Sequence, residues 1–393
     1  MKSDTKPTSA LQIPTSMAQW MELFVDLIFV AAMLVFSSSV DGLHSGVAKV
    51  WVEVSFAMVW WIWLCSTLLL DRFRLRDNLA RFVLLAQMFL IVLYSIEAKS
   101  GINHDHKMMF AEFGGLLLTV ALLWALVLRE PGDRTIYVKR MVVLNLVGAC
   151  LFFLAAPLKD TFSYPLCAAG LLIVLVPTVV PSLVAKEWPP FDREHLVERL
   201  GTFSLIVMGE TFIDIALSIS TRHVGSKDVI VLLFQFLFVF SLWAAYFEDI
   251  PHAGLQKARA SLWLFFHFTL QFSIVLIGMG VAAIVNAPDG EHLPDQDSVE
   301  IFGMMALFYL SLAVLDWCSD RKPLKNLILF RLAGFVLTLA IAILGVTVPS
   351  LKLDELVLAA TVVAMVSAFI APILIRKTSA PESEPALSSH HSV

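Results

Sequence analysis

Two pairs of acidic residues stand inside long apolar stretches of this chain, and the members of each pair are four positions apart. The first pair is Glu22 and Asp26, and the second is Glu210 and Asp214. Residues four apart share one face of a helix, and a carboxylate at mid-bilayer depth costs about 2.5 to 3.5 kcal/mol. Two ionised acids about 6 Å apart would repel by on the order of 3 kcal/mol at an effective dielectric near 20. Each pair is therefore expected to hold a proton or a cation, which is the chemistry of an ion or proton path.

The second pair follows charged residues that lead toward it along the same predicted helix. Glu198 and Arg199 stand near the start of this stretch, and Glu210 lies about fifteen residues, or roughly 22 Å, into it. This order suits a path from the membrane surface inward, although Glu198 and Arg199 could equally anchor the helix end. Gly209 would let a neighbouring helix approach the acid closely.

Three arginines are candidate counter-ions for the acids. Arg199 stands on the second acidic helix, Arg81 opens the third apolar stretch and could reach Glu22 or Asp26, and Arg72 lies in a turn rich in cations. Cations in such turns also bind phospholipid head groups or set the topology of the chain.

His267 is the histidine that lies well inside an apolar run. Because its ordinary pKa is near 6.5, an interior histidine suits a proton relay. The alternative is a hydrogen-bonded packing residue, so His267 joins Glu22, Asp26, Glu198, Glu210 and Asp214 as a candidate rather than an assigned site.

These residues must be positioned by membrane helices. Hydrophobic residues make up 58% of the 393, and apolar runs of about twenty residues recur from end to end, which indicates an all-α, polytopic integral membrane protein. We expect about twelve transmembrane helices, at 17–40, 46–70, 77–98, 107–129, 135–157, 162–184, 195–220, 227–248, 257–285, 298–316, 323–347 and 353–375.

Charge and composition set the expected topology. Most of the 28 Lys and Arg residues fall in alternate turns between the apolar runs, and the positive-inside rule then places both termini in the cytoplasm. Residues 1–16 and the tail 378–393 have too little apolar content to pack, so both are predicted to be disordered cytoplasmic segments.

The two halves of the chain are similar enough to predict a duplication. Residues 17–184 would form one six-helix membrane repeat and residues 195–375 the second, and an even number of helices per repeat makes the two parallel. The corresponding residues lie 176 to 183 positions apart, and they are Glu22 and Glu198, Trp60 and Trp243, Arg81 and Arg259, and Gln87 and His267.

The motifs that contain these residues resemble the bacterial low temperature requirement A (LtrA) family. The first is the segment from Trp20 to Val30, with Glu22 and Asp26; the others contain Arg72, Phe73, Asp77 and Arg81, then Glu198, Arg199, Gly201, Gly209 and Glu210, and finally His267. The chain departs from the family pattern at Asp71, Leu200 and Phe265. The resemblance implies a multi-pass protein of the bacterial inner (plasma) membrane with a role in growth in the cold, and no established biochemical activity.

The expected function is therefore that of a transporter that uses buried carboxylates, with proton coupling as one form. The alternatives are a cation channel and a structural or lipid-interacting membrane protein that supports growth in the cold. Expected partners are membrane lipids and a small solute, a cation or protons. Scattered basic residues and a net charge of −5 argue against nucleic acid. Because the chain carries no catalytic triad, phosphate-binding loop or zinc motif, we expect no enzyme, no metal and no cofactor.

Overall fold

The structure is a computed structural model that describes residues 17–40, 46–73, 78–101, 106–129, 135–179, 192–220, 226–250, 259–286, 295–319, 325–348 and 353–379. Its regular structure in these ranges is helical. The helices are α1 (Met17–Val40), α2 (Gly46–Arg72), α3 (Asn78–Gly101), α4 (Lys107–Val127), α5 (Thr135–Ala155), α6 (Asp160–Val179), α7 (Arg193–Ser220), α8 (Ser226–Phe247), α9 (Ala260–Asn286), α10 (Asp295–Trp317), α11 (Lys325–Thr347) and α12 (Leu353–Ser379).

The predicted helices are present, with ends that differ by a few residues. The last helix continues to Ser379, so the predicted disordered tail 378–393 starts two residues too early. Residues 1–16, 180–184 and 380–393 lie outside the described part of the chain, and the predictions made for them stay predictions.

Helices of 20 to 28 residues are about 30 to 42 Å long, which matches or exceeds the roughly 30 Å hydrocarbon core of a bilayer. Seven described helices are long and apolar enough to cross a membrane. Their spans are Glu53–Arg72, Asn78–Ala98, Lys107–Val127, Ile136–Ala155, Ala260–Val281, Val299–Trp317 and Lys325–Thr347. Many large apolar side chains on the outside of the bundle, such as Phe82, Phe89 and Leu329, are exposed, as lipid-facing residues would be.

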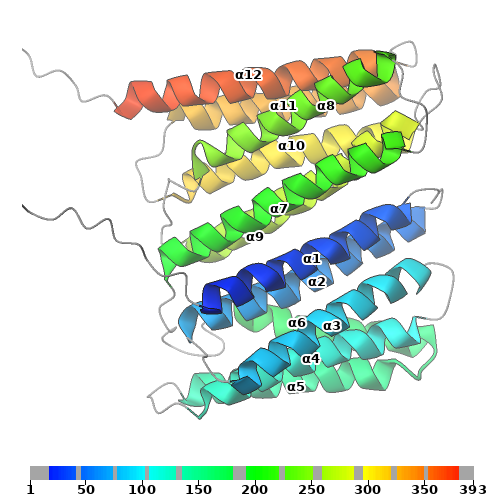
Figure 1. Ribbon diagram of the computed structural model, residues 1–393, viewed down its shortest axis with the longest axis vertical. Coiled ribbons are helices and arrows are strands. Elements are labelled where there is room, and N and C mark those ends of the chain that lie inside the picture. The colour runs from blue at the N-terminus through cyan, green and yellow to red at the C-terminus, as the bar shows by residue number, and fades with distance from the viewer. Residues whose placement is uncertain are drawn as a thin grey trace, which may run out of the picture.

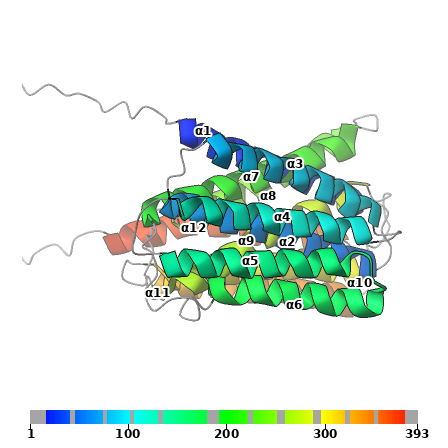
Figure 2. The same cartoon turned by 90° about the horizontal axis from the view of Figure 1, so that it is seen from below.

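The bundle consists of two groups of six helices. In Figure 1, α1 to α6 occupy the lower part and α7 to α12 the upper part, and α1 and α2 meet α7 and α9 at the centre. The view from below shows α4, α5 and α6 running alongside one another (Figure 2). We call these groups the first and second halves. The structure therefore places the acidic helices α1 and α7 side by side, across the contact between the halves.

The same five helix pairs pack together in each half. In the first half these pairs are α1 with α2, α1 with α3, α3 with α4, α4 with α5, and α5 with α6; the second half pairs α7 with α8, α7 with α9, α9 with α10, α10 with α11, and α11 with α12. Equivalent pairing is what a duplicated unit would produce, and the repeat itself stays a prediction.

Candidate functional site

Asp26 lies on α1 and is fully covered by groups from both halves. Arg199 of α7 contacts both carboxylate oxygens: its Nη2 donates to Oδ1 at 2.8 Å, and its Nη1 lies 2.8 Å from Oδ2. The ring N–H of Trp63, on α2, donates to the same Oδ1 at 2.8 Å. The side chain of Asp26 is 0% exposed and that of Arg199 is 7% exposed. A planar guanidinium against a carboxylate is a strong, charge-assisted geometry.

Glu22 lies one turn earlier on α1 and extends the charged contact toward the end of the bundle. Its Oε2 lies 3.2 Å from Nε2 of His195 and 3.8 Å from Nε of Arg199. The other ring nitrogen of His195, Nδ1, lies 2.8 Å from Oδ1 of Asp71, at the end of α2. Asp71 also accepts a hydrogen bond from the backbone N–H of Asp192 at 2.9 Å. His195 thus joins a carboxylate of α1 to a carboxylate of α2.

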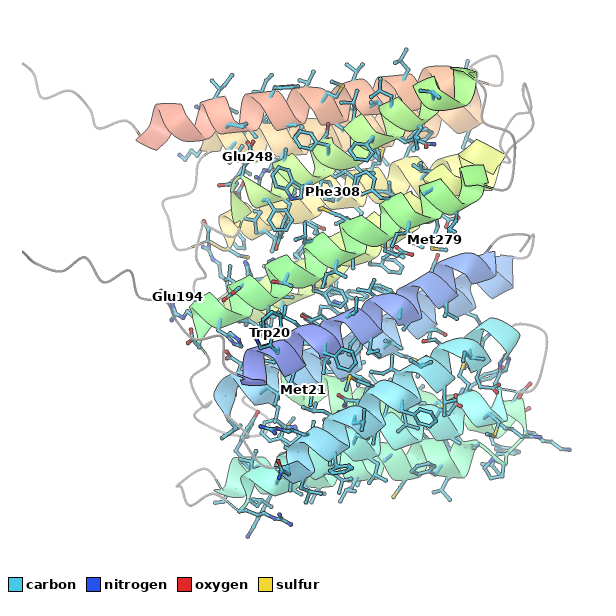
Figure 3. The ribbon with its side chains drawn as sticks, in the orientation of Figure 1. Trp20, Met21, Glu194, Glu248, Met279 and Phe308 are labelled. Atoms are coloured by element: carbon cyan, nitrogen blue, oxygen red, sulfur yellow. The ribbon has the colours of Figure 1, made fainter. Side chains whose placement is uncertain are left out.

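We call these five residues the inter-half cluster: Glu22, Asp26, Asp71, His195 and Arg199. The first turns of α1 and α7 and the last turn of α2 lie at the same end of the bundle, which is why residues so far apart in sequence meet there. Figure 3 shows that end through Trp20, at the start of α1, and Glu194, at the start of α7.

His195 is held in its charged form by its two acidic neighbours. Helix α7 is about 42 Å long by its 28 residues, which exceeds the roughly 30 Å hydrocarbon core, so the proposed crossing of α7 would leave its polar first turns outside that core. Hydrogen bonds to Asp71 and Glu22 raise the pKa of His195 from 6.5 to about 10, against the opposing effect of burial. The cluster then holds three acids and two cations, so its formal charge is negative by one when all are ionised.

The structure brings together some of the sequence-predicted residues and not others. Glu22, Asp26 and Arg199 meet, whereas the neighbouring Glu198 is exposed. Arg81 is exposed on α3, and the cations that contact Glu22 and Asp26 among the described residues come from α7 instead. The guanidinium of Arg72 donates to the backbone oxygen of Leu68, on its own helix, at 3.5 Å.

Glu210 lies deeper than the inter-half cluster. It is eleven residues, or roughly 16 Å, further along α7 than Arg199, and it is 1% exposed. Asp214 lies in α7, but its side chain is outside the described part of the structure. Gly209 does not make the expected close approach to any described residue, because a Cβ there would meet none of them within 4 Å. A Cβ on Gly278 of α9 would instead lie 2.7 Å from Oγ1 of Thr211.

His267 is a fully buried residue of α9, and each of its ring nitrogens has a hydrogen-bond partner. Its Nδ1 lies 3.0 Å from the backbone oxygen of Trp263, so it donates there, and its Nε2 lies 3.2 Å from the hydroxyl of Tyr246, with which it shares a hydrogen bond. The ring also packs on Trp263, with centroids 3.9 Å apart. These contacts agree with the interpretation of His267 as a hydrogen-bonded packing residue, and none of them requires His267 to act as a proton relay.

A second buried ion cluster was missed from the sequence. Arg331 of α11 contacts Asp249, just after α8, at 2.8 Å, and Asp316 of α10 at 2.5 Å; all three side chains are 1% exposed. Arg331 also donates to the backbone oxygen of Leu312 at 2.9 Å. We call Asp249, Asp316 and Arg331 the Arg331 cluster. Its signal in the sequence is an arginine inside an apolar run, but the alternating pattern of Lys and Arg does not distinguish Arg331 from the cations that set topology.

The inter-half cluster can therefore hold or release a proton while linking two groups of helices. Its acids and histidine offer titratable groups, and the partial exposure of His195, at 27%, and Glu22, at 15%, connects them to the end of the bundle. Within the described residues, no group of His, Cys, Asp and Glu is arranged to hold a metal ion.

Comparison with known proteins agrees with the motifs at this site. An uncharacterized protein of Rhizobium meliloti (strain 1021) is 28% identical over 254 residues, which are 62% of this chain and 61% of that protein, so the match spans less than two thirds of the relative's length. The model of the bacterial low temperature requirement A protein family matches residues 17–369, from the start of α1 into α12. That match includes the whole inter-half cluster. The chain belongs to the bacterial low temperature requirement A family.

Proposed function

We propose that this protein is a membrane transport protein in which the inter-half cluster controls movement of the two halves. One observation carries the proposal: Asp26 of the first half and Arg199 of the second form a buried ion pair at the contact between the halves. A gate requires two discrete arrangements whose energies differ by only a few kcal/mol, so that a trigger can exchange them. An ion pair across the contact between the halves is an interaction that such an exchange would break and re-form.

Protonation supplies a physical means of opening this contact. A proton on Asp26 or Glu22 removes the charge that holds Arg199, and a buried charge that loses its partner is strongly destabilising. The halves would then favour another arrangement in which Arg199 finds water or a different acid. His195, between Glu22 and Asp71, provides a titratable group on the exposed side of this pair. The solute would move as the closed contact opens.

The arrangement of the halves supports this proposal. Both halves use the same five helix pairs, and α1, α2, α7 and α9 make the contact between them. Repeats that rock against each other around a shared interface are a known basis of alternating access. The proposed sidedness puts the cluster and both termini at the cytoplasmic face of the inner membrane.

The test is proton movement in proteoliposomes that contain the purified protein. A pH-sensitive dye is trapped inside, the outside is acidified, and the potential is set with potassium and valinomycin; the run is repeated with a sodium gradient. We expect acidification faster than in protein-free liposomes, and its loss in Asp26→Asn. Asp160→Asn, a change at an exposed acid on α6, is the matched control. A wild-type rate equal to that of empty liposomes under every gradient would refute proton conduction and cation–proton exchange by this protein.

A structural or lipid-interacting role is the second candidate, and the closure of Asp26 favours it. Arg199 and Trp63 together occupy the carboxylate, and its side chain is 0% exposed, as in a static clamp between helices. This candidate predicts no solute or proton flux. It also predicts that Asp26→Asn changes the stability of the protein without changing any flux. A cation channel would instead conduct ions with no dependence on the pH gradient.

A further inference from the structure

A groove separate from both ion clusters lies between helices of the two halves. Its volume is about 660 Å³, within the range of sites for small ligands. Helices α2 and α6 of the first half and α9 of the second form its walls. The residues that line it include Ala57, Trp60, Trp61, Ser261, Phe265 and Phe268. Phe265 and the neighbouring Leu262 are exposed, so the groove opens on the outer surface of the bundle.

The chemistry of the groove suits hydrocarbon. The walls from α2 and α9 belong to the apolar spans Glu53–Arg72 and Ala260–Val281, so the opening faces the lipid of the bilayer. Among the described residues that line it, the side-chain nitrogen and oxygen atoms are limited to the hydroxyl of Ser261 and the ring nitrogens of the two tryptophans. The N–H of Trp60 is already used, because it donates to Oε1 of Gln271 at 2.6 Å. A polar solute would find few partners here.

The shape of the lining favours a flexible chain over a helix. Helices that pack together in membranes meet through small residues, whereas most of this lining consists of Leu, Met, Phe and Trp side chains, with Ala57 and Ser261 as the small exceptions. The ends of this protein, 1–16 and 380–393, are rich in polar residues and do not match an apolar groove. A hydrocarbon chain adapts to such an irregular wall.

A positively charged side chain, that of Arg259, lies at the N-terminal end of α9, which is the end that carries Ser261. Arg259, two residues before Ser261, donates one hydrogen bond to the backbone oxygen of Trp317 and lies over the ring of that tryptophan, 3.8 Å from its centroid. A guanidinium has five N–H donors, so further donors remain for a phosphate. We propose that the groove binds one acyl chain of a membrane phospholipid, whose phosphate lies near Arg259.

A bound chain would lie against the contact that holds the two halves together. Trp60 lines the groove and bonds to Gln271, and the amide of Gln271 donates to the backbone oxygen of Leu200 at 3.2 Å and to Ser204 Oγ at 3.0 Å. Leu200 follows Arg199 of the inter-half cluster. Three residues therefore connect the wall of the groove to the ion pair, and the lipid site stands whether or not the protein transports a solute.

The test uses a phospholipid with a photoactivatable group in its acyl chain, placed in proteoliposomes with the full-length protein. After illumination, mass spectrometry locates the labelled residues. We expect label concentrated on residues 54–64 of α2 and 261–268 of α9. Label spread evenly around the lipid-facing surface would overturn the proposal, and so would cross-links that join these segments of two copies of the chain. This labelling experiment uses the wild-type protein alone.

Filling the groove gives a second measurement. Ala57→Trp should lower labelling of these segments about tenfold, the effect of losing about 1.4 kcal/mol of binding. Ala359→Trp, at an exposed alanine of α12, is the matched control and should leave the labelling unchanged. Arg259→Gln should reduce the preference for anionic over zwitterionic phospholipid. An unchanged label in Ala57→Trp, with both variants folded alike, would contradict the assignment of the groove.

Discussion

The inter-half cluster and the Arg331 cluster use similar groups in different places. Each sets an arginine against acids, and Asp71 and Asp249 stand 178 positions apart, at or just after the ends of α2 and α8. The first cluster joins the two halves and reaches partly exposed residues, whereas the second joins α8, α10 and α11 inside one half and is 1% exposed throughout. The proposed gate therefore lies at the partly exposed cluster that joins the halves, whereas the Arg331 cluster holds together helices of one half.

Burial explains why the two clusters should respond differently to change. Removing one member of a buried ion pair leaves an uncompensated charge that the surrounding protein cannot solvate. Water at the edge of a cluster moderates that cost, because a partly exposed charge keeps some of its hydration. The comparison between the two clusters can therefore be tested by measuring how much stability the protein loses when a residue of each cluster is replaced.

The largest loss is expected for Arg331→Met. It leaves Asp249 and Asp316 buried without their guanidinium, and the cost is about 3 to 5 kcal/mol. Thermal unfolding in detergent micelles would show a much lower transition temperature or a loss of folded protein. Lys139→Met, at an exposed position of α5, removes a cation without this effect. Equal transition temperatures for the two variants would show that the Arg331 cluster is not a clamp.

Arg199→Met should cost less, about 2 to 3 kcal/mol, because it removes charge-assisted hydrogen bonds at a cluster with partial access to water. Adding Asp26→Asn to the Arg199→Met variant should recover part of the lost free energy of unfolding, because the side chain at position 26 is then neutral and needs no counter-ion. A double-mutant cycle over Asp26 and Arg199 measures their coupling directly. Strictly additive losses would mean that the two residues do not act as a pair, and the proposed gate would then lose its basis.

The helices and part of the inter-half cluster were predictable from the sequence. Runs of about twenty apolar residues fixed the helices almost to their ends, because bilayer thickness sets helix length. Glu22, Asp26 and Arg199 were recognisable as charges that an apolar environment makes expensive. Their pairing was not predictable, since Arg81 was as plausible a partner as Arg199 until the packing of α1 against α7 was known.

The residues that could not be identified from the sequence have a common property. Asp71, Asp249 and Asp316 stand at the ends of apolar runs, where charged residues usually face water, and only the arrangement of neighbouring helices buries them. Arg331 carried a clearer signal, because it lies six residues inside α11, where a charge is costly. Its partners come from two other helices, and no local spacing identifies them.

His195→Gln should produce a smaller loss that depends on pH. The pKa of His195 is raised to about 10 in the folded protein, so its contribution is complete below 6.5 and is lost as the pH rises through about 10. At pH 6 the variant should be less stable than the wild type by about 1 kcal/mol, and above pH 10 the two should converge. Unfolding curves at several pH values measure this difference. A difference that grows with pH would contradict the assigned charge.

The smallest loss of stability is expected for a change at Glu198. Glu198 precedes Arg199 but is exposed, so Glu198→Gln should change the free energy of unfolding by no more than about 0.5 kcal/mol. Glu22→Gln removes the acid that faces His195 and should cost about 1 kcal/mol. Both changes neutralise one glutamate at the same end of the bundle, so unfolding measurements on the pair separate position from charge. If Glu198→Gln were the more harmful, the face of α7 that contacts α1 would have to be reassigned.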